Sequence, residues 1–170
     1  MQAVSGNGSR GAGVFSFPDP VDEVSARLVA GGVVVLAAVA FVSGWTWLVG
    51  LIACGFTARV LSGPTLSPLA QLVTRVLRPR LPIAARLVPG PPKRFAQGIG
   101  ALLTTAAAVL ALGFDQWTGV RVLLAGVIVA ATLESVFALC LGCKVFALLM
   151  RAGVIPAAVC ERCNTFGAAR

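Results

Sequence analysis

The chain has 170 residues, of which 58% are hydrophobic and only 12% are charged, and its mean hydropathy is +0.92. This composition excludes an ordinary soluble domain, which needs more charge to cover its surface. The formal net charge is +8 and histidine is absent, so histidine-based catalysis and metal ligation are excluded. No RNA- or DNA-binding motif accompanies the basic residues, and we therefore expect no nucleic-acid partner.

The N-terminal half predicts a tail followed by a helical hairpin. Residues 1–17 are rich in glycine and serine and lack periodicity, so we expect a disordered tail before a transmembrane domain over residues 18–151. The first helix is expected over 20–42, with Asp19 as the N-cap and Pro20 at the first helical position. The second helix is expected over 45–61, because the uncharged run that contains both is too long for one straight span and SGWTW interrupts it.

A basic loop follows. Residues 59–94 carry no acidic residue and seven basic ones, which are Arg59, Arg75, Arg78, Arg80, Arg86, Lys93 and Arg94. The positive-inside rule places such a loop in the cytoplasm. Within it, Ser67 is a candidate cap, and apolar residues at helical spacing from Leu69 to Leu77 predict a short amphipathic helix. That helix is expected either on the inner leaflet of the membrane or against the transmembrane bundle.

The C-terminal half predicts a second hairpin. Spans are expected over 95–114 and from Val120 to about Leu141, joined by the turn DQWTG. Four spans return both termini to the cytoplasm and leave only Arg121 of the 14 basic residues outside. The sequence therefore predicts an all-α, multi-pass protein of the cell membrane, in contact with the lipid bilayer. Its elements are two antiparallel hairpins, a short interfacial helix and a cysteine-containing cytoplasmic tail over 152–170.

Four of the five cysteines form two Cys-x-x-Cys pairs, Cys140/Cys143 and Cys160/Cys163. Their spacing, with 16 residues between the pairs, lies in the range of four-thiolate zinc sites. The same pairs could exchange disulfides with a soluble thioredoxin-like protein, or carry a persulfide. A third interpretation makes the first pair small apolar residues that pack the fourth helix, as we expect for the lone Cys54.

The reactivity of the first pair depends on the helix that carries it. We expect Cys140 and Cys143 at or near the C-terminal end of a continuous fourth helix, unless Gly142 breaks it. A helix C-terminus raises the pKa of a thiol. A reactive pair there would therefore need cations such as Lys144, or a restart of the helix.

Glu134 is the other polar residue that requires an explanation, because a carboxylate inside a span is costly and usually faces a partner or a wet cavity. On a continuous helix it points away from the two thiols, so we do not assign it as their base. We expect it to pair with Arg59 or Gln97 near the inner face. A proton or ion path is the alternative.

Three stretches resemble a known family. They are PPKRFAQGIG at 91–100, ESVFALCLGCKVFALLMR at 134–151 and CERC at 160–163. Over roughly residues 18–165, the chain resembles the bacterial integral-membrane family catalogued as domain of unknown function 4395. The resemblance implies a small multi-pass protein without an assigned activity. It also implies association with thioredoxin-like and sulfurtransferase proteins, near which members are often encoded, and so favours thiol or sulfur chemistry.

Three functions stay open at this point. The first is a thiol-redox or sulfur-handling component whose exchanging pairs are Cys140/Cys143 and Cys160/Cys163, with a thioredoxin-like or sulfurtransferase partner. The second is a non-catalytic membrane anchor or assembly factor whose tail folds around zinc held by the same four cysteines. The third is a small-solute transporter.

Overall fold

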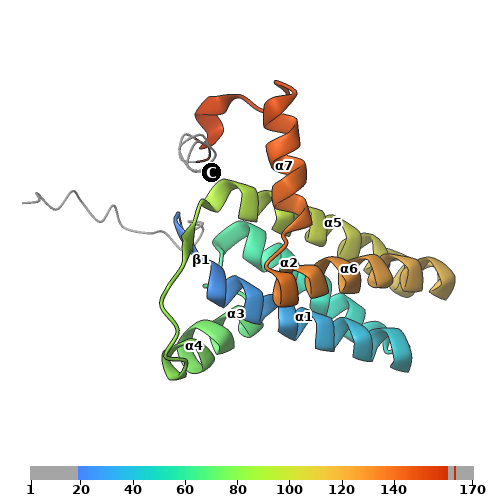
Figure 1. The fold of residues 1–170 in the computed structure, drawn as a ribbon. Helices are drawn as coiled ribbons and strands as arrows, with labels where there is room; N and C mark the ends of the chain where they lie inside the picture. The colour runs from blue at the N-terminus through green and yellow to red at the C-terminus, as the bar shows by residue number, and fades with distance from the viewer. Residues whose placement is uncertain (1–18, 161–162, 164–170) are drawn as a thin grey trace, which may run out of the picture.

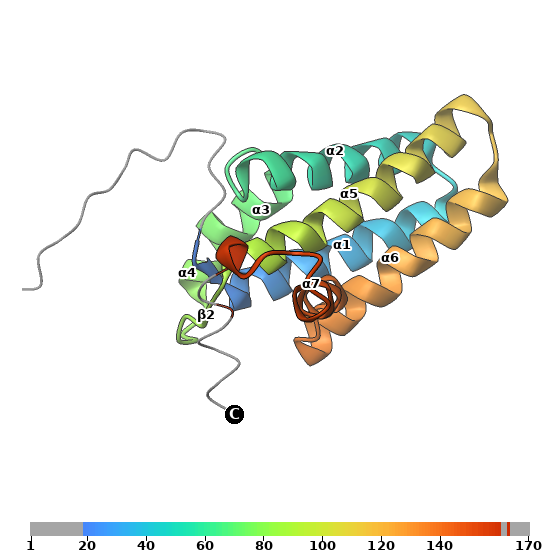
Figure 2. The ribbon, with the colours of Figure 1, turned by 90° about the horizontal axis from the view of Figure 1, so that it is seen from above.

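The computed structural model describes residues 19–160 and residue 163, so the predicted tail over 1–17 lies outside the described residues. In this part of the chain four long helices form an antiparallel bundle (Figure 1), namely α1 (Glu23–Ser43), α2 (Thr46–Ser62), α5 (Gly90–Gly113) and α6 (Trp117–Phe137). Helix α7 (Leu141–Arg151) stands across the bundle axis. It is seen end-on in Figure 2, where the four long helices run along the page.

The length and apolar composition of the helices are typical of membrane-spanning segments. Within the described residues, three helices (α1, α5 and α6) are long and apolar enough to cross a bilayer, and α2 is apolar but shorter. The outer surface of the bundle is also apolar, with exposed side chains at Val35, Leu102, Val122 and Val129. Apolar side chains turned outward fit a hydrocarbon environment rather than water. The chain is therefore a mostly helical, membrane-associated protein.

Small residues bring the helices close together. Helix α2 packs chiefly against α5, and α1 against α6. Ala37, Ala40 and Ala107 have no exposed surface in this core, and a side chain added at Gly100 would collide with the ring of Phe56. Small residues at helix contacts are typical of membrane bundles, in which tight packing replaces the hydrophobic effect.

The predicted break between the first two helices is confirmed. Helix α1 ends at Ser43, and Gly44 adopts a left-handed conformation (φ 68°) while its N–H donates to the carbonyl of Ala40 at 3.0 Å. Glycine is favoured in that conformation. We call the end of the bundle with this turn and the turn at 114–116 the turn end, and the opposite end, with loop 63–89 and α7, the loop end.

The start of α1 differs from the prediction. Its N-cap is Asp22 rather than Asp19, because β1 (Val21–Asp22) pairs in antiparallel fashion with β2 (Leu87–Val88) and holds residue 22 extended. The carboxylate of Asp22 accepts hydrogen bonds from the N–H of Val24 at 3.2 Å and from Nε of Arg78 at 2.6 Å. The described chain is thus not purely α-helical, and Asp22 ties the start of α1 to the loop.

The predicted amphipathic helix of the loop is present in three short pieces: α3 (Pro68–Leu72), a π-helical turn η1 (Val73–Leu77) and α4 (Arg78–Arg80). Ser67 occupies the N-cap position, as predicted. Ala70 and Val73 are buried against Val29 of α1. The helix therefore packs on the bundle, which is the second of the two predicted positions.

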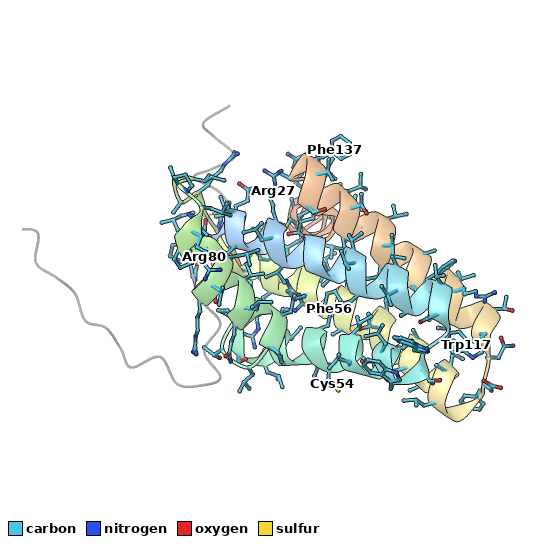
Figure 3. All side chains as sticks on the ribbon, turned by 90° about the horizontal axis from the view of Figure 1, so that it is seen from below. Arg27, Cys54, Phe56, Arg80, Trp117 and Phe137 are labelled. Atoms are coloured by element: carbon cyan, nitrogen blue, oxygen red, sulfur yellow. A yellow bond between two sulfur atoms is a disulfide. The ribbon has the colours of Figure 1, made fainter. Side chains whose placement is uncertain are left out.

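The ends of the second hairpin also differ from prediction. Helix α5 begins at Gly90 rather than Phe95, because prolines fit the first turn of a helix. Helix α6 ends at Phe137, and Ala138 is left-handed (φ 55°). Arg27 of α1 caps the C-terminus of α6, since its guanidinium donates hydrogen bonds to the carbonyls of Ser135 and Val136, each at 3.0 Å (Figure 3). The prediction of a helix continuing through Cys140 is therefore wrong.

Candidate dithiol site

Cys140 and Cys143 lie in the first turn of α7. Cys140 is the N-cap residue, and its Sγ accepts a hydrogen bond from the N–H of Cys143 at 3.3 Å. Cys140 is buried, Cys143 is half-buried, and both are free thiols. The free N–H groups and the dipole of a helix N-terminus stabilise negative charge. The dithiol thus occupies the favourable end of a helix, and its predicted position at a helix C-terminus is wrong.

Gly142 allows α7 to cross α5 closely. A Cβ at this position would lie 2.5 Å from Cβ and 2.6 Å from Cα of Ala96. One turn further on, the buried ring of Phe146 contacts Phe95, with 5.5 Å between the ring centroids. These contacts fix α7 on α5. The sequence analysis considers a helix break at Gly142, but Gly142 lies within α7 and the break lies at Ala138.

An ion pair lies beside the dithiol. Nζ of Lys93, in the first turns of α5, is 2.6 Å from Oε1 of Glu134 in α6, and the two side chains are 9% and 19% exposed. The close partner of Glu134 is therefore Lys93 rather than Gln97, and the predicted partner Arg59 also interacts with it electrostatically. Because α6 ends at Phe137, the helical-wheel argument that separated Glu134 from the thiols does not hold. Glu134 and Cys140 line the same cavity.

Lys93 is the residue beside the dithiol that the sequence analysis does not identify, because it assigns Lys93 only to the basic loop. One signal could have found it: a carboxylate within an apolar span requires a nearby cation. Lys93 also interacts electrostatically with both thiols. Its charge therefore acts on the dithiol as well as on Glu134.

The surroundings drive the two thiol pKa values apart. The pKa of Cys140 is lowered, mainly by the hydrogen bond from the Cys143 thiol and further by the charge of Lys93, although burial and Glu134 oppose this. The pKa of Cys143 is raised, because its thiol donates that hydrogen bond and because it is buried. Cys140 is thus the group that forms the thiolate, and the thiolate is the nucleophilic form of cysteine.

Two cavities meet at Cys140. The first, of about 310 Å³, is enclosed by the four long helices and the start of α7; its wall is mostly apolar but includes Arg59, Gln97, Glu134 and Cys140. The second, of about 450 Å³, lies at the loop end, and both sulfur-bearing residues line it together with Glu23, Lys93 and Lys144. Cys140 can therefore be approached from two sides with different chemistry, and Cys143 from the loop end.

The second Cys-x-x-Cys pair is oxidised in the structure. Cys160, the buried last residue of the 3₁₀ helix η2 (Ala157–Cys160), forms a disulfide with Cys163. Over residues 19–160 and 163, no group of three or more cysteine or carboxylate side chains is close enough to hold a metal ion. Zinc binds thiolates rather than disulfide sulfurs. A zinc centre built from all four cysteines would need Cys160 and Cys163 in the reduced form.

The fifth cysteine is remote from this site. Cys54 is exposed on the outer side of α2 (Figure 3). The expectation that it packs inside the bundle is wrong. Its position makes it a useful reference thiol, because it shares no helix with the dithiol.

Fold and site together define a helical membrane protein that carries a partly buried dithiol at one end of its bundle. The family described as Domain of unknown function (DUF4395) matches residues 21–151, and the chain belongs to this family, as its resemblance had indicated. The matched range includes Lys93, Glu134, Cys140 and Cys143, and it ends before Cys160. Comparisons with curated proteins and with solved structures find no match.

Proposed function

We propose that the protein is a membrane-bound thiol–disulfide exchange component whose working pair is Cys140 and Cys143. The observation that carries the proposal is the placement of Cys140 at the N-cap of α7, with a lowered thiol pKa and the protonated thiol of Cys143 beside it. An attacking cysteine at a helix N-terminus with a second cysteine three residues later is suited to disulfide exchange.

The exchange has two steps. The Cys140 thiolate attacks a substrate disulfide, forms a mixed disulfide and releases one substrate thiolate. Cys143 then loses its proton and attacks Sγ of Cys140, which closes the Cys140–Cys143 disulfide and releases the second substrate thiolate. Two electrons pass from the dithiol to the substrate, and the reverse sequence oxidises a substrate dithiol.

The proposed partner is a soluble thioredoxin-like or sulfurtransferase protein, which reaches the sulfurs through the cavity at the loop end. Both sulfur-bearing residues line this cavity. The same exchange can reduce the Cys160–Cys163 disulfide, which would make Cys160 and Cys163 a second redox-active pair. With a sulfurtransferase, Cys140 would instead accept a sulfane sulfur as a persulfide.

We further propose four membrane spans with both termini in the cytoplasm. Helix α2 has 17 residues, so it is about 26 Å long, close to the minimum for a span. Basic residues at the loop end, such as Arg75 and Arg80, favour the cytoplasmic side of the cell membrane. The cytoplasm is reducing, which suits the free Cys140/Cys143 dithiol and exposes the Cys160–Cys163 disulfide to reduction there.

In this orientation α7 lies along the membrane surface. Leu141, Val145 and Leu148 are exposed on one stripe of the helix, while Lys144 and Arg151 are exposed on another. An amphipathic helix of this kind places its apolar stripe toward the acyl chains and its cations toward the headgroups. The dithiol then sits at the boundary between lipid and water.

The test uses the full chain, purified anaerobically in detergent. Reduced protein is mixed with oxidised thioredoxin, and thioredoxin reduction is followed together with the loss of titratable thiols. We expect Cys140→Ser to abolish exchange and Cys143→Ser to trap a mixed disulfide, because the resolving thiol is missing. Cys54→Ser is the matched control and should exchange at the wild-type rate.

Two alternatives predict different outcomes. For an anchor with structural zinc, elemental analysis would find about one zinc per chain, and the thiols would become titratable only after chelation. For a transporter, Glu134→Gln would abolish flux in liposomes while leaving the number of titratable thiols unchanged. Either result, with no exchange by the wild type, would refute the proposed function.

A further inference from the structure

We propose that the 310 Å³ cavity beside Cys140 binds a lipid-soluble quinone, which accepts the two electrons of the Cys140/Cys143 dithiol. This inference rests on the proposed thiol function and adds to it the electron acceptor on the membrane side.

The shape and wall of the cavity fit such a ligand. Its volume is at the lower end of the range of about 300–1,000 Å³ for small-molecule sites, which suits a single ring system. Much of the wall is apolar, including Val33, Leu103 and Val127. Gly126 of α6 and Val145 of α7 line it and are also exposed. The cavity therefore opens on the apolar side of the bundle, and a quinone could enter from the hydrocarbon without crossing water.

The polar end of the cavity offers hydrogen bonds of both kinds. Oε1 of Gln97 is buried and has no hydrogen-bond partner among the described residues. A buried acceptor without a donor is unfavourable, and a quinol hydroxyl would supply one. Arg59, only 5% exposed, lies on the same wall. Its guanidinium and the amide N–H groups of Gln97 can donate to quinone carbonyls.

The position of Cys140 completes the chemistry. Cys140 lines this cavity as well as the one at the loop end, whereas Cys143 lines only the loop-end cavity. Cys140 is thus the sulfur that the quinone meets, and a soluble partner can reach the pair from the other side. In the oxidising step two S–H bonds break and one S–S bond forms. The quinone takes up the two electrons and two protons, and its two carbonyl oxygens become hydroxyls. One quinone and two thiols thus give one quinol and one disulfide.

The test uses the reduced full chain, freed of reductant and kept anaerobic, with decylubiquinone as the probe. The ring of this quinone is fully substituted, so thiols cannot simply add to a ring C–H position. Quinol formation is followed by absorbance, and thiols are counted in the same samples. We expect one quinol for every two thiols lost, and no reaction with Cys140→Ser or Cys143→Ser.

Two glycine variants probe the cavity. A Cβ added at Gly126 or Gly98 meets nothing within 4 Å, so both positions have open space where a side chain would begin. Gly126 lines the cavity, whereas Gly98 is not among its described lining residues. We expect Gly126→Leu to slow quinone reduction at least about tenfold by filling the cavity. Gly98→Leu should keep the wild-type rate, and both variants should still exchange with oxidised thioredoxin.

The outcomes separate this inference from the proposed function. A wild-type protein that exchanges with thioredoxin but leaves decylubiquinone oxidised would overturn the quinone site and leave the exchange function standing. A protein that reacts with neither would overturn both. Equal quinone reduction by Gly126→Leu and the wild type would show that the reaction occurs outside the cavity, which also contradicts the inference.

Discussion

Replacing Gly142 with alanine is expected to separate α7 from α5 and to slow the chemistry of the dithiol. The new Cβ would lie 2.5 Å from Cβ of Ala96, whereas ordinary contact begins at 3.4 Å. The helices must then move apart by 3.4 − 2.5 = 0.9 Å. Overpacking of this kind costs about 1–3 kcal/mol. The movement displaces Cys140 relative to Cys143, whose thiol and N–H donate the hydrogen bonds that lower the pKa of the Cys140 thiol.

The assay compares Gly142→Ala with Gly98→Ala, a helical glycine whose added Cβ meets nothing within 4 Å. Thermal unfolding in detergent should place Gly142→Ala about 1–3 kcal/mol below this control, and alkylation of Cys140 at neutral pH should be slower. Adding Ala96→Gly to the Gly142→Ala variant should restore only part of the lost stability, because Cα of residue 96 would still lie 2.6 Å from the new Cβ. Equal stability and equal alkylation in the two alanine variants would refute the reasoning.

Three further predictions concern charge and exposure. Lys93→Met should raise the pKa of Cys140 by removing a positive charge, so the pH profile of its alkylation moves to higher pH, while Lys93→Arg leaves the profile in place. Asp22→Asn breaks the 2.6 Å pair with Arg78 and should lower the free energy of unfolding by about 1–3 kcal/mol at pH 7, measured by thermal unfolding. Burial raises the pKa of Asp22, but its hydrogen bonds lower it by more, so the pKa in the folded protein lies below the usual value of 3.8. The stabilisation is therefore fully present above pH 3.8 and is lost as the pH falls through the pKa of the folded state. At that low pH the wild type and the variant should have similar free energies of unfolding. Cys54, exposed on α2, should resist a membrane-impermeant maleimide in liposomes and react with it in detergent. Labelling of Cys54 in intact liposomes would contradict the proposal that α2 spans the membrane.

Local signals predicted much of the fold. The SGWTW interruption and the apolar runs on either side of it are visible in the sequence, and they predict the first two helices within a few residues. The end of α6 was not predictable in this way. It is set by Arg27, which lies 108 residues from the Ser135 carbonyl that it binds. Hydropathy windows contain no information on such a contact.

The candidate site was predicted in part for the same reason. The Cys-x-x-Cys spacing identified the residues, but the position of Cys140 at a helix start depends on where α6 ends. The pairing of Lys93 with Glu134 bridges 41 positions in the chain, and it requires α5 to begin five residues before the expected span. Errors in two helix boundaries thus changed the predicted electrostatics of the whole site.

The position of Asp22 has a consequence for biosynthesis. Its partner Arg78 is translated 56 residues later, after the whole of α2. A nascent chain that has inserted only its first hairpin therefore carries an acidic side chain at the membrane edge whose partner has yet to leave the ribosome. Domains are completed from the N-terminus during synthesis. The contact that ties the start of α1 to the loop can therefore form only after α2 has been synthesised.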